Sequence, residues 1–118
     1  MPRFVLLEHD HPALHWDLML ETAESLHTWR LPQPPRSALV VSAVRIAEHR
    51  LAYLDYEGPV SDNRGHVRRW DAGHFEWLQQ ADSLIVLRLK GATLNGLLRL
   101  NRQEGDQWLI RFEAEGAL

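Results

Sequence analysis

Two histidines and an aspartate near the N-terminus have the residue types and the spacing of a metal site. His9 ends a β-favouring segment, and His15 and Asp17 follow two residues apart, so they project from one face of a strand. A turn at Pro12 would bring His15 alongside His9. Two neutral imidazoles and a carboxylate suit Zn²⁺, Mn²⁺ or a related metal, with positions left open for substrate or water. The spacing predicts a metal site formed by these three residues, with Glu21, further along the strand face, orienting one histidine.

Other interpretations of this segment stay open. The three side chains could form a polar strand face in contact with solvent, with His9 and His11 as ordinary loop residues. A pair of His9 and His11 with a later carboxylate would imitate the metal site of a cupin barrel. Asp10 to Pro12 has the composition of a turn, however, and the glycine spacing of cupins is missing.

His49 and Tyr53 form a second candidate pair, whose use depends on local structure. In an extended strand these residues would lie about 13 Å apart, whereas in a helical turn they would be neighbours. A turn would let both contact one phosphate, with the histidine as proton donor and the tyrosine as hydrogen-bond donor. The alternative is that Tyr53 packs in the core beside Leu51 and Leu54, and spacing alone favours that alternative.

The basic residues bear on the class of partner. Arg64, His66, Arg68 and Arg69 form a local cluster that could contact a phosphate backbone, although a solvated hairpin edge is the commoner meaning of such a run. The net charge is −3 and the isoelectric point is near 6.1, which argues against broad nucleic-acid binding. A small phosphate-recognising pocket remains compatible with these values.

Alternating apolar and polar residues indicate that strands position these side chains. In residues 14–21, for example, leucines and a tryptophan alternate with His15, Asp17, Met19 and Glu21. Short strands at about 8–12-residue spacing predict an all-β fold in a single domain over residues 1–118, either a barrel or a sandwich. In a barrel, we expect the metal site at an open end. The expected strands are 3–9, 14–21, 26–31, 39–47, 67–70, 74–78, 84–90, 97–100 and 108–112, with 71–73 as a hairpin turn and 49–56 undecided.

Length and composition limit the remaining classes. The chain has 118 residues, of which 45% are hydrophobic and 25% charged, as in an ordinary globular domain. The absence of cysteine excludes disulfides, thiolate zinc sites and cysteine nucleophiles. No apolar run approaches the ~20 residues that cross a bilayer. We therefore expect a soluble, cytoplasmic, monomeric protein with no membrane partner.

The order of motifs resembles a known family. The segments Phe4–His9 and Leu14–Glu21 resemble the opening of the 3′-phosphoesterase domain of bacterial DNA ligase D. The resemblance covers about residues 3–113 and implies a stand-alone, single compact β-barrel with short turns or helical segments that processes DNA ends in repair. It also implies a divalent metal, Mn²⁺ first and Zn²⁺ or Co²⁺ as alternatives. Later landmarks that match in order lie at 25–29, 32, 49–58, 70–73, 91–96 and 108–111.

Carried over to this sequence, the resemblance assigns His9, His15 and Asp17 to the metal, and His49 and Tyr53 to the scissile phosphate. The implied activity is the metal-dependent trimming of 3′-phosphates and 3′-ribonucleotides from DNA or RNA-tipped DNA ends. One alternative is a catalytically weak or inactive module that binds a metal and a phosphorylated end and acts with repair partners such as a separate ligase. Another is an enzyme acting on a small phosphate or carboxylate, because fold does not fix function.

Several positions depart from the family pattern. Met19 stands where the family places an arginine on the phosphate, and methionine supplies no charge or planar fork. Leu7 replaces a glutamine, Gln33 stands where a lysine is common, and residues 59–65 replace a glycine-rich stretch. The residues expected to bind substrate and supply the lost charge are Arg30, Arg64 and Arg68.

Overall fold

The computed structural model describes residues 1–116. These residues form nine β-strands and one short 3₁₀ helix, η1, and contain no α-helix. The strands run β1 (Arg3–His9), β2 (His15–Glu21), β3 (Leu26–Leu31), β4 (Val40–His49), β5 (Gly58–Pro59), β6 (His66–Gln80), β7 (Leu84–Gly91), β8 (Asn95–Glu104) and β9 (Gln107–Ala114), with η1 (Leu51–Leu54) between β4 and β5.

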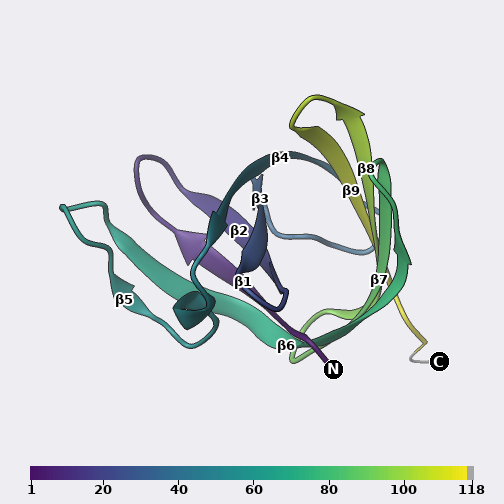
Figure 1. Cartoon of the computed structure of the whole chain (residues 1–118), viewed down its shortest axis with the longest axis horizontal. Coiled ribbons are helices and arrows are strands. Elements are labelled where there is room, and N and C mark those ends of the chain that lie inside the picture. Colours follow the sequence, from purple (N-terminus) through teal and green to yellow (C-terminus); the bar gives the residue numbers. More distant parts are fainter. Residues whose placement is uncertain (117–118) are drawn as a thin grey trace.

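The strands form one closed antiparallel barrel (Figure 1). Their order is β1-β2-β3-β4-β9-β8-β7-β6, and the pairing of β1 with β6 closes the ring of eight strands. The two-residue strand β5 pairs with the first two residues of β6, on the edge opposite β1. The expected all-β class and barrel architecture are therefore confirmed.

The barrel interior is filled by apolar side chains from alternate strand positions. Phe4, Leu6, Leu18 and Trp29 belong to one cluster of buried residues that includes members from β7, β8 and β9. Trp29 packs edge to face against Trp108, with ring centroids 5.6 Å apart. The barrel is thus a packed core rather than a pore.

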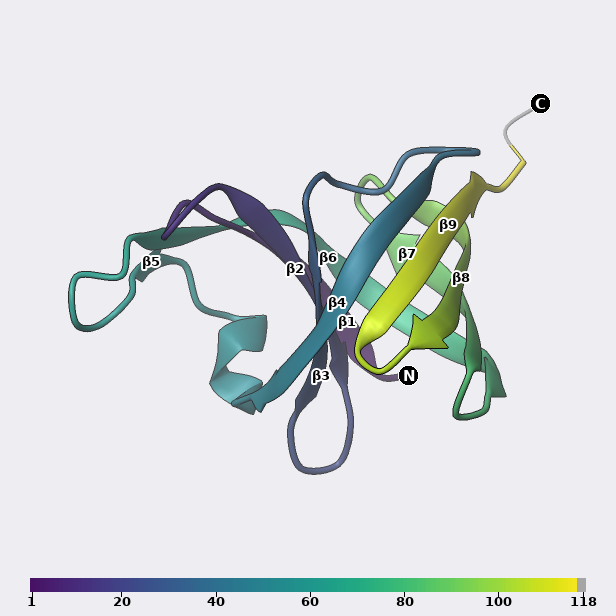
Figure 2. The same cartoon turned by 90° about the horizontal axis from the view of Figure 1, so that it is seen from above.

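A second, smaller core lies on the outer face of the wall formed by β1, β2 and β6. Since Leu6 and Leu18 face the interior, alternation turns Leu7 and Met19 outward. The 3₁₀ helix covers them, and Figures 1 and 2 show η1 and β5 outside the ring of strands, near the ends of β1 and β2. The members of this outer cluster are Val5, Leu7, Met19, Leu26, Leu54 and Val67.

The expected hairpin turn at residues 71–73 is wrong, because β6 runs unbroken from His66 to Gln80. The Asp71 carboxylate is buried and accepts hydrogen bonds from the backbone N–H groups of Ala92, Thr93 and Leu94, at 2.9, 3.1 and 2.7 Å. Asp71 therefore anchors the β7–β8 turn instead of making a turn of its own. Gly73 fits because a Cβ there would lie 2.1 Å from the Lys90 carbonyl oxygen.

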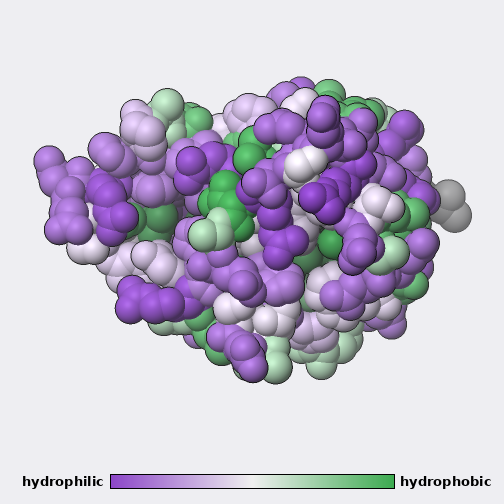
Figure 3. Space-filling model, turned by 45° about the horizontal axis from the view of Figure 1, so that its top comes forward, coloured by the Kyte–Doolittle hydropathy of each residue, from purple (hydrophilic) through white to green (hydrophobic). Residues whose placement is uncertain are grey.

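One face of the molecule is mostly polar. The face in Figure 3 is mainly hydrophilic, and its hydrophobic residues lie in small separate patches. Within residues 1–116, no helix combines the length and apolar character required for a membrane span.

Replacing the buried carboxylate tests its anchoring role. We expect Asp71→Ala to lower the free energy of unfolding by about 2–4 kcal/mol, because it leaves three backbone donors without their acceptor. Urea unfolding followed by tryptophan fluorescence measures this. Glu24→Ala, at an exposed position in the β2–β3 turn, should change the value by less than about 0.5 kcal/mol. An Asp71→Ala protein as stable as Glu24→Ala would contradict the assignment.

Candidate metal centre

His9, His15 and Asp17 converge on the outer face of the β1–β2 wall. His9 and His15 are direct cross-strand partners, and their ring centroids lie 4.8 Å apart. Each of the three side chains offers one ligand atom, and these atoms lie within 4.8 Å of one another. The expected position at an open end of the barrel is wrong, because Asp17 alternates with the interior residue Leu18 and so faces outward.

Backbone carbonyl groups orient both imidazoles. The His15 Nδ1–H donates to the Ala13 carbonyl oxygen at 2.8 Å, and the His9 Nε2–H donates to the Arg64 carbonyl oxygen at 2.8 Å. A carbonyl can only accept, so these contacts select the tautomer of each neutral ring. The lone pairs left for a ligand are on His15 Nε2 and His9 Nδ1.

The chemistry of these atoms fits a divalent cation. The side chains of His15 and Asp17 are only 8% and 3% exposed, and His15 Nε2 lies 3.4 Å from Asp17 Oδ2. Within the described chain, His15 Nε2 and Asp17 Oδ1 are buried without a hydrogen-bond partner. Leaving such groups unsatisfied is costly, and a cation bound between them would remove the cost.

Two of the candidate ligands, His9 and Asp17, line a cavity of about 160 Å³ that receives side chains from several elements. His49 and Tyr53 reach it from the end of β4 and from η1, opposite the β1–β2 wall. The loop before β6 closes another side. The cavity is lined by His9, Asp17, Met19, Arg30, His49, Tyr53, Val60, Arg64 and Val67.

The turn that His49 and Tyr53 required is present. Strand β4 ends at His49 and η1 begins at Leu51, and the rings of His49 and Tyr53 lie edge to face with centroids 5.6 Å apart. The His49 Nδ1–H donates to the Ala47 carbonyl oxygen at 3.0 Å, which leaves Nε2 as the ring nitrogen for a ligand. Tyr53 also packs against the outer cluster, so its ring both fills space and lines the cavity.

Two of the three arginines expected to bind substrate lie at the cavity, and the third does not. Arg30 and Arg64 line the cavity, and Arg30 Nε lies 3.5 Å from Asp17 Oδ1. Arg68 is not among the lining residues. Its neighbour Val67 faces the cavity, so alternation turns Arg68 away, where it pairs with Glu8 at 2.8 Å. The placement of Arg68 beside the substrate is therefore corrected.

Glu21 does not orient either histidine. It lies six residues beyond His15 on β2, about 20 Å along an extended strand, and its carboxylate accepts the backbone N–H of Arg3 at 2.8 Å. The carbonyls of Ala13 and Arg64 hold the imidazoles instead. Sequence reasoning missed them because every residue carries a carbonyl, and no residue type marks the ones that are used.

Met19 forms the apolar part of the cavity wall. Its side chain is 1% exposed and points to the same outer face as His15 and Asp17, as expected from the strand. It packs within the outer cluster. An arginine at this position would place a guanidinium at the cavity, whereas methionine supplies only packing.

Comparison with known proteins places the chain among DNA end-joining relatives. A family model described as "DNA Ligase D 3'-phosphoesterase domain" matches residues 7–102. The multifunctional non-homologous end joining protein LigD of Pseudomonas aeruginosa is 31% identical over 92% of this chain, and that of Mycobacterium bovis is 29% identical over 90%. The chain spans only 14% and 15% of the lengths of these two proteins.

The tether that holds η1 against the barrel should respond to pH. Asp55, directly after η1, accepts a hydrogen bond from Arg3 at 2.6 Å, and this bond lowers the pKa of the Asp55 carboxyl below its ordinary value. Because that pKa is lowered on folding, the stabilisation is present above the ordinary pKa and is lost as the pH falls through the lowered value. We expect a carboxyl-detected NMR titration to give a higher Asp55 pKa in Arg3→Gln. The distant Arg88→Gln should leave it unchanged, and an equal effect of both variants would contradict the tether.

Proposed function

The chain belongs to the DNA ligase D 3′-phosphoesterase domain family, and on that premise we propose that it is a metal-dependent phosphoesterase that trims 3′-phosphate or 3′-ribonucleotide ends of DNA. The observation that supports this most directly is the grouping of His9, His15 and Asp17 beside a cavity that His49 and Tyr53 also line. The relatives' names place them in non-homologous end joining, so we propose broken DNA ends, including RNA-tipped ones, as the substrate.

In this proposal His9 Nδ1, His15 Nε2 and an Asp17 oxygen hold the cation, Mn²⁺ in the first instance and Zn²⁺ or Co²⁺ as alternatives. The bound metal would polarise the phosphate and activate or position the nucleophile. The carbonyls of Ala13 and Arg64 fix the two imidazoles in the tautomers that offer these lone pairs.

His49 is the proposed proton donor. With Nδ1–H committed to the Ala47 carbonyl, a protonated His49 would donate from Nε2 to the 3′ oxygen as the bond from that oxygen to phosphorus breaks. Tyr53 O–H would donate a hydrogen bond to a non-bridging oxygen of the phosphate. Because the two rings are in contact across the short connection from β4 to η1, both groups would lie on one side of the substrate.

Arg30 is the proposed replacement for the family's arginine at the Met19 position. Arg30 is the direct cross-strand partner of Asp17, and its side chain reaches the cavity from β3, one strand away from Met19. A guanidinium can bind a phosphate through two parallel hydrogen bonds. Arg64 lines the same cavity and is the second candidate for phosphate contact.

A second candidate function is a weak or inactive module that binds a metal and a phosphorylated end alongside repair partners such as a separate ligase. The buried, apolar Met19 favours it, because one charged contact of the family pattern is missing at that position. The two functions differ in turnover, which makes them separable in one assay.

We expect the wild-type protein with Mn²⁺ to shorten a primer–template that ends in a 3′-ribonucleotide and to release phosphate from one that ends in a 3′-phosphate. His49→Ala should abolish both reactions while manganese affinity, measured by electron paramagnetic resonance, stays nearly unchanged. His15→Ala should lose both activity and metal binding. His74→Ala, at an exposed position on β6, is the matched control and should behave as wild type. Tight binding of the end without turnover would favour the inactive module, and loss of metal binding in His49→Ala would contradict its role.

Arg30→Gln should reduce turnover on 3′-phosphate ends by about tenfold to a hundredfold at saturating Mn²⁺, since a hydrogen bond to a charged group is worth ~1.5–3 kcal/mol. Arg68→Gln, which alters an arginine outside the cavity, should have the wild-type rate. Adding Met19→Arg to Arg30→Gln should restore part of the lost rate, provided that the double variant unfolds at a similar temperature. Equal rates for Arg30→Gln and Arg68→Gln would assign phosphate recognition elsewhere.

A further inference from the structure

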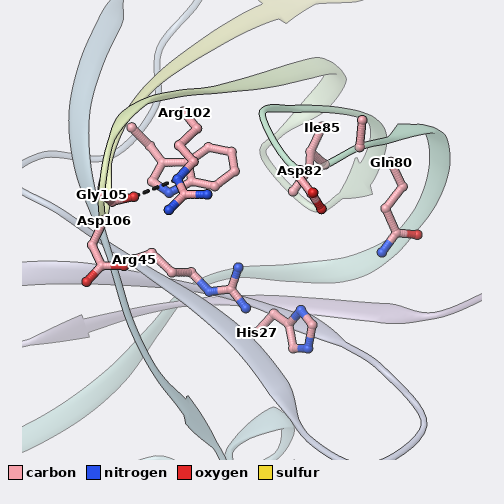
Figure 4. A pocket seen from close by; sticks show the side chains of 10 residues that line it. His27, Arg45, Gln80, Asp82, Ile85, Arg102, Gly105 and Asp106 are labelled. Carbon is pink, nitrogen blue, oxygen red and sulfur yellow. Dashed lines mark hydrogen bonds between the residues drawn. The ribbon is translucent and has the colours of Figure 1, made fainter.

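A second and larger cavity lies at a mouth of the barrel, on the inner side of the wall. Its volume is about 530 Å³, and it receives residues from β3, β4 and the turns that join β6 to β7 and β8 to β9. Figure 4 shows Arg45 and His27 extending side by side, with Arg102 above them and Asp82 and Gln80 across the cavity. The metal centre, on the outer face, does not share these residues.

The three basic side chains occupy positions that the strand pattern assigns to the interior. Cross-strand partners point to the same face of a sheet, and each of these residues is paired with a member of the interior core. Elsewhere on the same strands the interior positions hold residues such as Leu31, Ala43 and Leu98. Two arginines and a histidine at interior-facing positions that are apolar elsewhere on these strands point to a ligand rather than to packing. The three pairs are His27–Leu20, Arg45–Trp29 and Arg102–Trp108.

The guanidinium of Arg45 is held in place without a neutralising partner. It lies 4.5 Å from the centroid of the Trp29 ring, a cation–π distance. Burial lowers the pKa of the Arg45 guanidinium, and Glu48 and Asp106 only partly offset that effect. Among residues 1–116, no carboxylate oxygen lies within 4.0 Å of the side-chain nitrogens of Arg45 or Arg102.

The remaining charged groups around the cavity are largely engaged or at its rim. The Glu48 carboxylate accepts a hydrogen bond from Ser25 Oγ–H at 2.6 Å, and His27 Nε2 lies 2.9 Å from the same carboxylate oxygen. Arg102 Nε–H donates to the Gly105 carbonyl oxygen at 2.7 Å, which fixes the guanidinium and leaves its terminal N–H groups for a ligand. Asp82 and Asp106 line the cavity as well, so an anion would be favoured there only in contact with both guanidinium groups.

We propose that this barrel mouth binds a small phosphate monoester of about the size of a mononucleotide, at a site separate from the metal centre. Two guanidinium groups suit a doubly charged phosphate, which each can contact through a planar pair of N–H donors. Ile85 and Trp108 line the same cavity and offer apolar surface to the organic part of the ligand. The volume of about 530 Å³ lies in the range of small-molecule sites.

Calorimetric titration of the full chain with adenosine 5′-monophosphate, inorganic phosphate and adenosine tests this site. A chelator in the buffer keeps the metal centre from contributing. We expect adenosine monophosphate to bind, inorganic phosphate to bind more weakly, and adenosine to bind far more weakly than either. Arg45→Gln and Arg102→Gln should each weaken phosphate-dependent binding by about tenfold or more. Arg99→Gln, an exposed arginine on the same strand as Arg102, should bind as wild type.

Arg102→Gln keeps the test decisive if Arg45→Gln fails to fold, because Arg102 is exposed and contributes little packing. Equal affinities for inorganic phosphate and adenosine monophosphate would support the phosphate site and identify the free anion as its ligand. Four results would overturn the proposal. The first two are no binding of any probe at millimolar concentration and equal affinity for adenosine and its monophosphate. The other two are binding that appears only when Mn²⁺ replaces the chelator, and binding that is unaffected in both Arg45→Gln and Arg102→Gln.

Discussion

The wall made by β1 and β2 is buried on both of its faces, and the positions of the core, the cavity and η1 all follow from this constraint. Strand alternation sends Leu6 and Leu18 into the barrel and Leu7 and Met19 outward. Burying such a side chain stabilises the fold by about 1.5–3 kcal/mol, so the outer set needs a cover. The 3₁₀ helix and the loop that follows it provide that cover, and the same packing brings His49 and Tyr53 over the wall.

The candidate metal centre lies where this outer face changes from apolar to polar. Along β2 the outward positions run from Met19 through Asp17 to His15, and all three are at least 94% buried. Burial of an imidazole and a carboxylate is costly unless their polar atoms are satisfied. The Ala13 carbonyl accepts the hydrogen bond of His15 Nδ1–H. Two buried atoms, His15 Nε2 and Asp17 Oδ1, have no hydrogen-bond partner. A bound cation would satisfy both atoms.

Period-two patterns predict much of this arrangement, and their limits have physical causes. The alternation around His15 and Asp17 predicts the strand and its shared face, and Pro12 predicts the return that pairs His9 with His15. The sequence of these strands does not show which face points out of the barrel, because both faces of the wall carry apolar residues. The error at residues 71–73 has a similar origin. Aspartate and glycine in sequence indicate a turn, but here Asp71 serves a turn on another strand and Gly73 relieves a close backbone approach.

Alternation also explains how a domain of this size can carry two polar cavities without a second layer of structure. On β3, Trp29 faces the barrel interior and supports Arg45 at the mouth, while the next residue, Arg30, faces outward beside Asp17. On β4, Arg45 faces inward, and a register shift between the pairs Thr28–Ile46 and Leu26–His49 turns His49, at the strand end, toward the outer cavity. Adjacent residues of one strand therefore serve opposite sides of a single wall. Apolar side chains pack on both faces of that wall, and within residues 1–116 the two cavities share no lining residue.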